Sequence, residues 1–160
     1  MEIALARVDD RLIHGQVVTA WLRQIGRCDE IIVCDDRASR DVLTRQVIQM
    51  AKPPGMDVRV LSVEDTLSEW ERSREDHRRV LLLTRAPGPM RQLLEQGVIF
   101  DRLNLGGMAG GPNRRKLHNS VFVDDNELAD LHQIMALGVP IDIRMVPTDP
   151  GIDFARVDPG

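Results

Sequence analysis

Short runs of apolar residues alternate along the chain with longer stretches in which apolar residues recur every three or four positions. The short runs have the character of buried strands, and the longer stretches have the period of an amphipathic helix. The runs of strand character are residues 3–8, 29–34, 57–62, 80–84, 102–105, 119–123 and 141–146. Strands that alternate with helices are typical of a mostly parallel sheet with helices on both faces. The sequence therefore predicts an α/β protein with a three-layer α/β/α fold and a sheet of about seven strands.

Segment 106–116 interrupts this alternation, because it contains four glycines and three basic residues but no helical periodicity. We predict an irregular connection there, which can reverse a strand and make the sheet mixed. Residues 148–160 also lack periodicity and are expected to form a loosely held tail. A length of 160 residues suits one domain with a single core. We therefore predict one domain over residues 1–160.

The charges of the chain argue against a nucleic-acid partner. The 21 basic and 25 acidic residues are spread along the sequence and give a net charge of −4, and three Phe, two Trp and no Tyr leave few rings on which bases stack. The apolar runs are far shorter than the roughly 20 residues that span a bilayer. Because the amino terminus also lacks a signal-peptide pattern, we expect a cytoplasmic protein.

His14 lies in the turn between the first predicted strand and the first helix, whose apolar positions begin at Val17. Ligands of open α/β sheets bind outside the carboxyl ends of the strands, and a helix amino terminus favours bound anions. At such a position an imidazole can carry a phosphoryl group, while Arg11 and the amides of Gly15 and Gln16 stabilise its oxygens. A lone histidine after a strand is more often a cap or a packed ring, so the local pattern makes His14 a candidate only.

The decapeptide Val-Asp-Asp-Arg-Leu-Ile-His-Gly-Gln-Val at residues 8–17 resembles the phosphorylation-site segment of the IIB component of the mannose/fructose/sorbose family of the bacterial sugar phosphotransferase system. The resemblance extends from residue 3 to about residue 149 and implies a three-layer α/β/α fold. It also implies that His14 accepts a phosphoryl group from a phosphohistidine of a IIA component and passes it to the incoming sugar, as a protein-N-phosphohistidine–sugar phosphotransferase. Membrane IIC and IID partners then present the sugar and bring the chain to the inner membrane.

The glycine-rich segment contributes to the same resemblance, since its Gly-Gly-Met sequence is similar to a turn that approaches the phosphohistidine site in the family. Gly107 and Met108 are therefore candidate site residues. The segment departs from the family pattern in the basic pair Arg114 and Arg115, which can dock an acidic IIA surface. His118 follows this pair and is a candidate phosphate contact. We predict no metal and no cofactor, and the sequence leaves the sugar and a homo-oligomer open.

An acidic pair precedes Arg11, and its role has several interpretations. One of Asp9 and Asp10 can accept a hydrogen bond from a ring nitrogen of His14 and so select the nucleophilic nitrogen. Asp10 can instead pair with Arg11 and hold its guanidinium. A simple turn-capping role for one of the two is as plausible as either.

A second acidic pair, Asp35 and Asp36, follows the second predicted strand at the same edge of the sheet. We expect Asp36 to lie behind the phosphate site. The pair also supports a rival hypothesis of a receiver-like regulatory module, in which an aspartate is phosphorylated and carboxylates hold Mg²⁺. A further alternative keeps the phosphorylated His14 but makes the chain a phosphorylation-state sensor without sugar transport.

Overall fold

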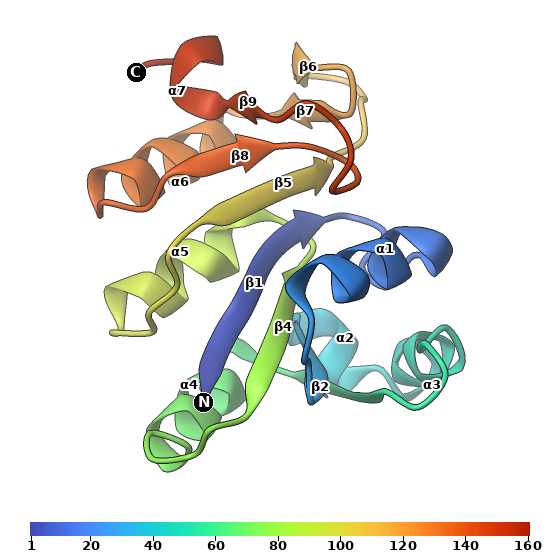
Figure 1. Ribbon diagram of the computed structural model, residues 1–160. Coiled ribbons are helices and arrows are strands. Elements are labelled where there is room, and N and C mark those ends of the chain that lie inside the picture. Colours follow the sequence, from blue (N-terminus) through green and yellow to red (C-terminus); the bar gives the residue numbers. More distant parts are fainter.

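The computed structural model describes residues 1–160, which form nine strands and seven helices (Figure 1). The strands are β1 (Glu2–Asp9), β2 (Glu30–Cys34), β3 (Asp57–Leu61), β4 (Arg79–Thr84), β5 (Leu103–Gly107), β6 (Arg115–His118), β7 (Val121–Val123), β8 (Ile141–Ile143) and β9 (Ile152–Asp153). The helices are α1 (Gly15–Ile25), α2 (Asp36–Arg40), α3 (Val42–Met50), α4 (Val63–Arg72), α5 (Pro87–Glu95), α6 (Asp125–Ala136) and α7 (Phe154–Val157). None of them combines the length and the hydrophobicity that crossing a membrane requires.

Seven strands form one sheet in the order β3-β2-β4-β1-β5-β8-β9, and only the β8–β9 pair is antiparallel. Helices α4, α5 and α6 cover one face of this sheet, to the left in Figure 1, and α1, α2 and α3 cover the other face, to the right. The predicted three-layer α/β/α fold with a mixed, mostly parallel sheet is confirmed.

Strand β4 supplies apolar side chains to both layers of the core. Val80 and Leu82 pack in the layer beneath α4, α5 and α6, whereas Leu81 and Leu83 pack in the layer beneath α1, α2 and α3. All four side chains are completely buried, and burying each contributes roughly 1.5–3 kcal/mol. The unbroken apolar run at this position is therefore explained by burial on both faces of the sheet.

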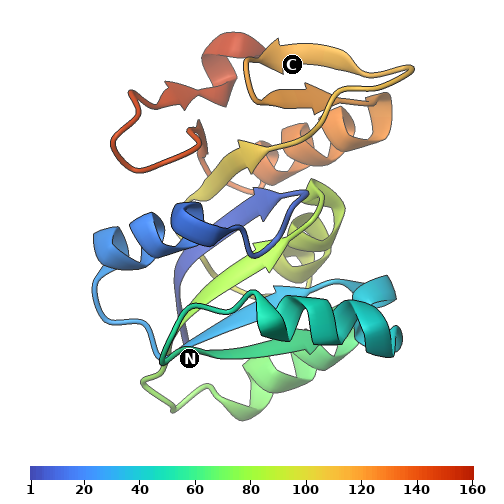
Figure 2. The same ribbon diagram turned by 90° about the vertical axis from the view of Figure 1, so that its right-hand side faces the viewer.

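The order of the strands places a topological switch point between β1 and β4. The chain leaves β1 through α1 and reaches β2 on the far side of β4, but it leaves β4 through α5 and reaches β5 on the far side of β1. The two connections therefore diverge to opposite faces of the sheet, as Figures 1 and 2 show. In open α/β sheets such a switch point, outside the carboxyl ends of the strands, is where ligands bind.

The prediction of a sheet strand at 119–123 is wrong. The observed strand β7 pairs with β6 in a separate antiparallel hairpin, which stands apart from the main sheet in Figure 2. A bridge between Met108 and Val121 joins this hairpin to the end of β5. Part of segment 106–116, expected to be irregular, therefore forms β6, and the turn before it uses the left-handed conformation of Asn113 (φ 59°).

The carboxyl-terminal residues also differ from the expectation of a loosely held tail. Strand β9 pairs antiparallel with β8 and is the reversed strand that makes the sheet mixed. Phe154 of α7 is completely buried, and Asp158 accepts a hydrogen bond from His132 at 2.9 Å if the ring donates through Nε2. A two-residue strand and a four-residue helix are too short to give a periodic pattern.

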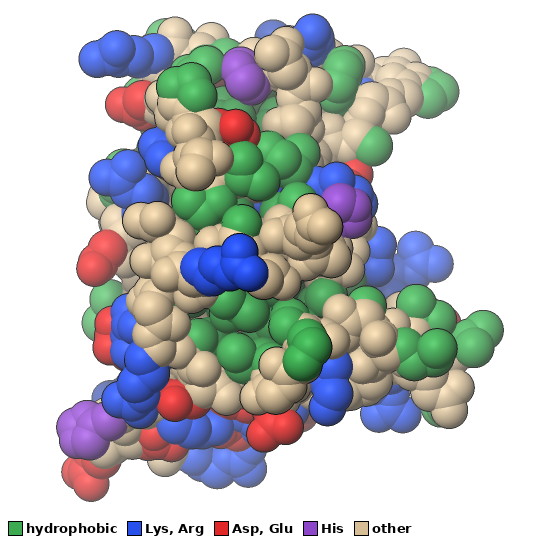
Figure 3. All heavy atoms as spheres, turned by 45° about the vertical axis from the view of Figure 1, so that its right-hand side comes forward, with side chains coloured by type: hydrophobic (Ala, Val, Ile, Leu, Met, Phe, Trp, Pro, Cys, Tyr) green, Lys and Arg blue, Asp and Glu red, His purple; other side chains and the backbone are tan.

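Helices α2 and α3 follow β2 and are separated by Asp41, which is the C-cap of α2 and the N-cap of α3. The Asp41 Oδ1 atom accepts a hydrogen bond from the Leu43 amide at 3.2 Å and caps α3. Helix α3 leaves apolar side chains at the surface, with Val42, Leu43 and Met50 exposed by 59%, 68% and 85%. Figure 3 shows hydrophobic side chains protruding on this side of the molecule.

Candidate functional site

The turn between β1 and α1 carries the candidate residues and lies at the switch point between β1 and β4. Leu12 and Ile13, 3% and 8% exposed, anchor the turn in the core beneath α1. Leu12 has a φ of 56°, a left-handed conformation that few side chains adopt, and Gly15 has a φ of 38°. Between these two constrained positions His14 is exposed at the surface.

His14 occupies the N-cap position of α1, and its side chain makes no capping hydrogen bond. Its carbonyl oxygen accepts hydrogen bonds from Val17 and Val18, at 3.0 and 3.3 Å. The first amides of a helix have no acceptor within the helix, and Gly15 and Gln16 are both exposed. The imidazole therefore lies in solvent, beside N–H groups that can bind an anion.

Arg11 is held by the carboxylate of Asp9. Its Nε atom donates to Asp9 Oδ1 and its Nη2 atom donates to Asp9 Oδ2, both at 3.0 Å, and its backbone amide donates to Oδ1 at 3.1 Å. Nη2 also contacts the sulfur of Met145 at 2.9 Å, whereas Nη1 has no hydrogen-bond partner. These bonds to Asp9 raise the pKa of Arg11, so the guanidinium is a fixed cation with one free donor group.

Asp9 is shared with a second arginine, which is buried inside the fold. Asp9 and Arg7 are each 1% exposed, and Arg7 Nη2 donates to Asp9 Oδ2 at 2.9 Å. Arg7 also donates to the side chain of Asn104 on β5 and lies with its Cζ atom 5.4 Å from the centre of the Trp21 ring. Burial opposes ionisation of Asp9, but the bonds from Arg11 and the charge of Arg7 outweigh it and lower its pKa.

Asp10 has a different role from Asp9. Its Oδ2 atom accepts a hydrogen bond from the Ala109 amide at 2.6 Å, and its own amide donates to the Gly107 carbonyl at 2.9 Å. Of the interpretations for this acidic pair, the pairing with Arg11 therefore falls to Asp9 instead of Asp10, because Asp9 ends β1 below the guanidinium while Asp10 points to the loop after β5. Asp9 also makes the turn-capping bond, and neither carboxylate bonds to His14.

The end of β5 approaches the same turn, as the Gly-Gly-Met resemblance implies. A Cβ atom on Gly107 would lie 3.2 Å from both Arg11 Nη2 and Asp9 Oδ1, so only glycine allows this approach without displacing the pair. Met108 is 1% exposed and belongs to the core. Its amide donates to Ser120 and its carbonyl accepts from Phe122, so it connects β5 to the β6–β7 hairpin.

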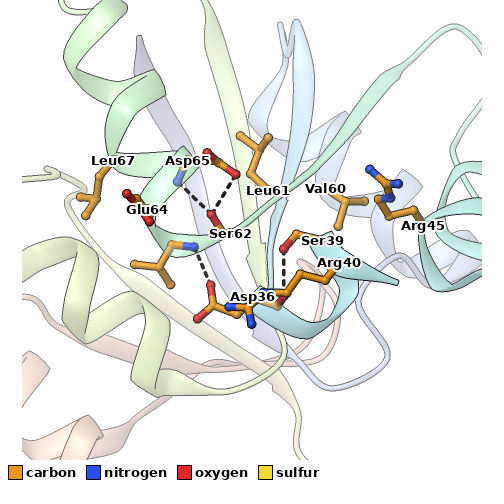
Figure 4. A pocket seen from close by; sticks show the side chains of 11 residues that line it. Asp36, Ser39, Arg40, Arg45, Val60, Leu61, Ser62, Glu64, Asp65 and Leu67 are labelled. Carbon is orange, nitrogen blue, oxygen red and sulfur yellow. Dashed lines mark hydrogen bonds between the residues drawn. The ribbon is translucent and has the colours of Figure 1, made fainter. Parts of the chain in front are cut away.

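Asp36 belongs to another part of the same sheet edge. Its Oδ1 atom accepts a hydrogen bond from the Val63 amide at the start of α4, at 2.8 Å. It lines a cavity of about 690 Å³ outside the ends of β2 and β3, and Figure 4 shows this bond together with the polar groups around it, among them those of Ser39, Arg40 and Asp65. No hydrogen bond joins Asp36 to the turn that carries His14.

Asp35 is connected to that turn through Arg85, which sequence reasoning missed. Asp35 caps α2 by accepting from the Ala38 amide at 2.8 Å, and its Oδ2 atom accepts from Arg85 Nε at 3.2 Å. Arg85 Nη1 donates to the carbonyl of Asp10 at 2.9 Å. The position of Arg85, directly after the most apolar strand, was a usable signal, because that strand ends at the same edge as β1.

The basic residues of the loop after β5 are largely paired within the chain. Arg114 forms ion pairs with Glu127 at 2.8 Å and Asp124 at 3.7 Å, and Arg115 forms one with Asp158. The side chain of Arg114 thus ties the loop to the amino end of α6. His118 lines a separate cavity, and its Nδ1 atom is buried without a hydrogen-bond partner.

Comparisons with known proteins agree with this architecture. The family model described as the PTS system sorbose subfamily IIB component matches residues 3–157. Over 154 residues the chain is 36% identical to the sorbose-specific EIIB component of Klebsiella pneumoniae, covering 96% of this chain and 93% of the relative. Over 150 residues it is 34% identical to the mannose-specific EIIAB component of Escherichia coli K12, covering 94% of this chain and 46% of the relative. The crystal structure of the IIBSor domain of the Klebsiella pneumoniae sorbose permease matches with a TM-score of 0.92 and 35% identity, covering 98% of this chain and 96% of that one.

Proposed function

Because the chain belongs to the sorbose subfamily of IIB components of the sugar phosphotransferase system (PTS), we propose that His14 is its phosphoryl acceptor. The observation that carries this proposal is the position of the ring. It is exposed and free of capping bonds at the amino end of α1, outside the switch point of the sheet. Arg11 lies three residues away with an unbonded Nη1 group.

The chemistry consists of two in-line transfers of one phosphoryl group. An unprotonated ring nitrogen of His14 attacks the phosphorus of a phosphohistidine donor, and a new P–N bond forms as the donor P–N bond breaks. In the second step a sugar hydroxyl attacks the same phosphorus, a P–O bond forms as the P–N bond to His14 breaks, and the hydroxyl proton passes to solvent. Arg11 Nη1 and the exposed amides of Gly15 and Gln16 stabilise the charge on the phosphoryl oxygens, while the fixed geometry supplies the positioning.

The partners follow from this role. The donor is the phosphohistidine of a IIA component, a proposal supported by the EIIAB name of the Escherichia coli relative, of which this chain matches less than half. The acceptor is a sugar presented by membrane IIC and IID subunits, at which the chain works from the cytoplasmic side of the inner membrane. Because His14 projects from the surface, either partner can reach it without opening the fold.

The test is phosphorylation of the purified chain with phosphoenolpyruvate, the general PTS proteins and a IIA component, followed by mass spectrometry of the peptide that contains His14. We expect one phosphate that is labile in acid and stable in alkali, and its complete loss in His14→Ala. His77→Ala is the matched control, since His77 is also exposed but lies before β4, at the opposite edge of the sheet. Phosphate that persists on His14→Ala would refute the proposal, and alkali-labile phosphate would indicate a carboxylate acceptor such as Asp35.

A further inference from the structure

We propose that Asp9 and Arg7 are positioning residues that set the orientation of Arg11 for phosphoryl transfer. This inference rests on the proposed function of His14 and adds two buried residues to the exposed ones described above. Neither Asp9 nor Arg7 reaches the surface, since each is 1% exposed. Their effect on the reaction therefore passes through the guanidinium of Arg11.

The carboxylate of Asp9 holds the guanidinium of Arg11 in one plane. The carboxylate uses both oxygens against Nε and Nη2, at 3.0 Å each, and this bidentate fork fixes the plane of the guanidinium. Nη1 is the only nitrogen of the group left without a protein partner. The side chain of Arg11 is 38% exposed and lies on the same turn as His14. A monodentate contact would leave the guanidinium free to rotate.

This contact requires that the buried carboxylate of Asp9 stays ionised. A buried carboxylate stays ionised only when it is paired and hydrogen-bonded. Arg7 provides the second cation, at 2.9 Å from Asp9 Oδ2. Arg7 is itself held from several sides, by the side chain of Asn104, by the Arg144 carbonyl at 3.3 Å and by the face of Trp21. Arg7, Asp9 and Arg11 therefore form a relay that connects β1, β5, α1 and the residue after β8 to the guanidinium of Arg11.

Gly107 leaves space free beside Asp9 and Arg11. A Cβ atom on Gly107 would lie 3.2 Å from Arg11 Nη2 and equally close to Asp9 Oδ1. Gly107→Ala therefore pushes on the fork without changing any charge. The backbone of Gly107 is not left-handed, so alanine meets no conformational strain there. This substitution tests the geometry of the fork separately from its electrostatics.

The experiment measures the steady-state rate of phosphoryl transfer from phosphorylated IIA through this chain, with kcat and KM resolved, for Asp9→Asn, Arg11→Ala and the double variant. Misplacement of a catalytic group by about 1 Å costs up to about 100-fold in rate. We expect Asp9→Asn to lower kcat by about 10- to 100-fold with little change in KM, because Asp9 is buried away from the donor. In the Arg11→Ala background Asp9→Asn should lower kcat no further, since its effect passes through Arg11. Arg7→Met should give the same non-additive pattern.

Asp29→Asn is the matched control. Asp29 forms the same kind of fork with an arginine two residues away, Arg27, at 3.2 and 2.8 Å, but at the amino end of β2. It should leave kcat unchanged. If Asp9→Asn does not fold, as judged by circular dichroism, Gly107→Ala takes its place in the cycle and should also lower kcat only when Arg11 is present.

The outcomes separate this inference from the proposed function. If His14 of the wild-type chain takes no phosphate, the proposed function fails. If the wild-type chain is phosphorylated but Asp9→Asn and Arg11→Ala lower kcat additively, or if Asp9→Asn and Gly107→Ala leave kcat unchanged, the positioning role is wrong while the acceptor stands.

Discussion

Gly106 is the residue whose substitution tests the packing of the buried arginine most directly. A Cβ atom at this position would lie 2.0 Å from Nη2, 2.2 Å from Cζ and 2.5 Å from Nη1 of Arg7. No carbon tolerates such distances, so Gly106→Ala forces the guanidinium from its place. Arg7 is buried and bonded on several sides, and it therefore has no vacant position to enter.

The expected cost follows from the bonds that Arg7 then loses. Separating the partners of a buried ion pair costs about 3–5 kcal/mol, and alanine in a strand recovers about 0.5–1 kcal/mol of backbone entropy. We therefore expect Gly106→Ala to lower the free energy of unfolding by about 3 kcal/mol, a large part of the 5–15 kcal/mol that is typical of a domain. The assay is urea unfolding at neutral pH, followed by the fluorescence of Trp21 and Trp70, with the slope m checked for constancy.

Gly111→Ala is the control for this experiment. Its Cβ atom would meet the Cδ atom of Arg114 at 3.5 Å, an ordinary contact, so the free energy of unfolding should stay within about 0.5 kcal/mol of the wild type. In an Arg7→Ala background, where the guanidinium is absent, Gly106→Ala should cost almost nothing more. The reasoning would be refuted if Gly106→Ala were as stable as the wild type, or if its cost persisted in full without the arginine.

Two further predictions concern stability away from the candidate site. Hydrogen bonds from Arg59 and Arg78 lower the pKa of Glu69. A carboxyl whose pKa is lowered in the folded state contributes stability above its unfolded pKa, near 4, and this contribution is lost as the pH falls further. The free energy of unfolding should thus decline below about pH 4, and less steeply in Glu69→Gln, as urea unfolding of both proteins at a series of acidic pH values would measure. Phe154→Ala should lower the free energy of unfolding by about 3–5 kcal/mol, because the ring is completely buried. A change under about 1 kcal/mol in urea unfolding would mean that α7 is dispensable to the fold.

His14 and Arg11 could be identified as candidate site residues from the sequence because they lie in one contiguous segment. The turn that carries His14 is local in sequence, and the spacing of apolar residues predicts the strand before it and the helix after it. Arg85 was missed although it directly follows the most apolar strand. Its contact with the carbonyl of Asp10 depends on β4 lying beside β1. Local sequence patterns do not predict the order of strands in a sheet.

The elements that sequence reasoning misplaced are short. Strands β6, β7 and β9 have two to four residues each, less than the length over which alternation can be recognised. Their positions depend on tertiary contacts, such as the bridge between Met108 and Val121 and the burial of Phe154. The estimate of seven sheet strands was correct, but one predicted strand belongs to the hairpin and one sheet strand lies in the expected tail.

A usable sign of the buried relay was present in the first predicted strand. Arg7 interrupts the apolar run at 3–8, and a charged residue within a strand covered on both faces requires a partner. The sequence offers Asp9 two positions later, on the same side of the strand. What could not be predicted is the shared use of this carboxylate by Arg11, because that depends on how the chain turns after Asp9.

The burial of the charged side chains of Arg7 and Asp9 at the end of β1 requires an explanation. Apolar residues of similar volume often stabilise a fold as well as a buried ion pair does, since desolvation offsets most of the Coulomb attraction. Forks between an aspartate and an arginine two residues away occur elsewhere in the chain, but the carboxylates of Asp29 and Asp142 are more exposed than that of Asp9, 33% and 12% against 1%. Only the fork of Asp9 shares its carboxylate with a second, buried arginine. Stability alone does not account for two cations on one carboxylate at the switch point of the sheet, whereas a requirement to hold Arg11 in one orientation beside His14 does.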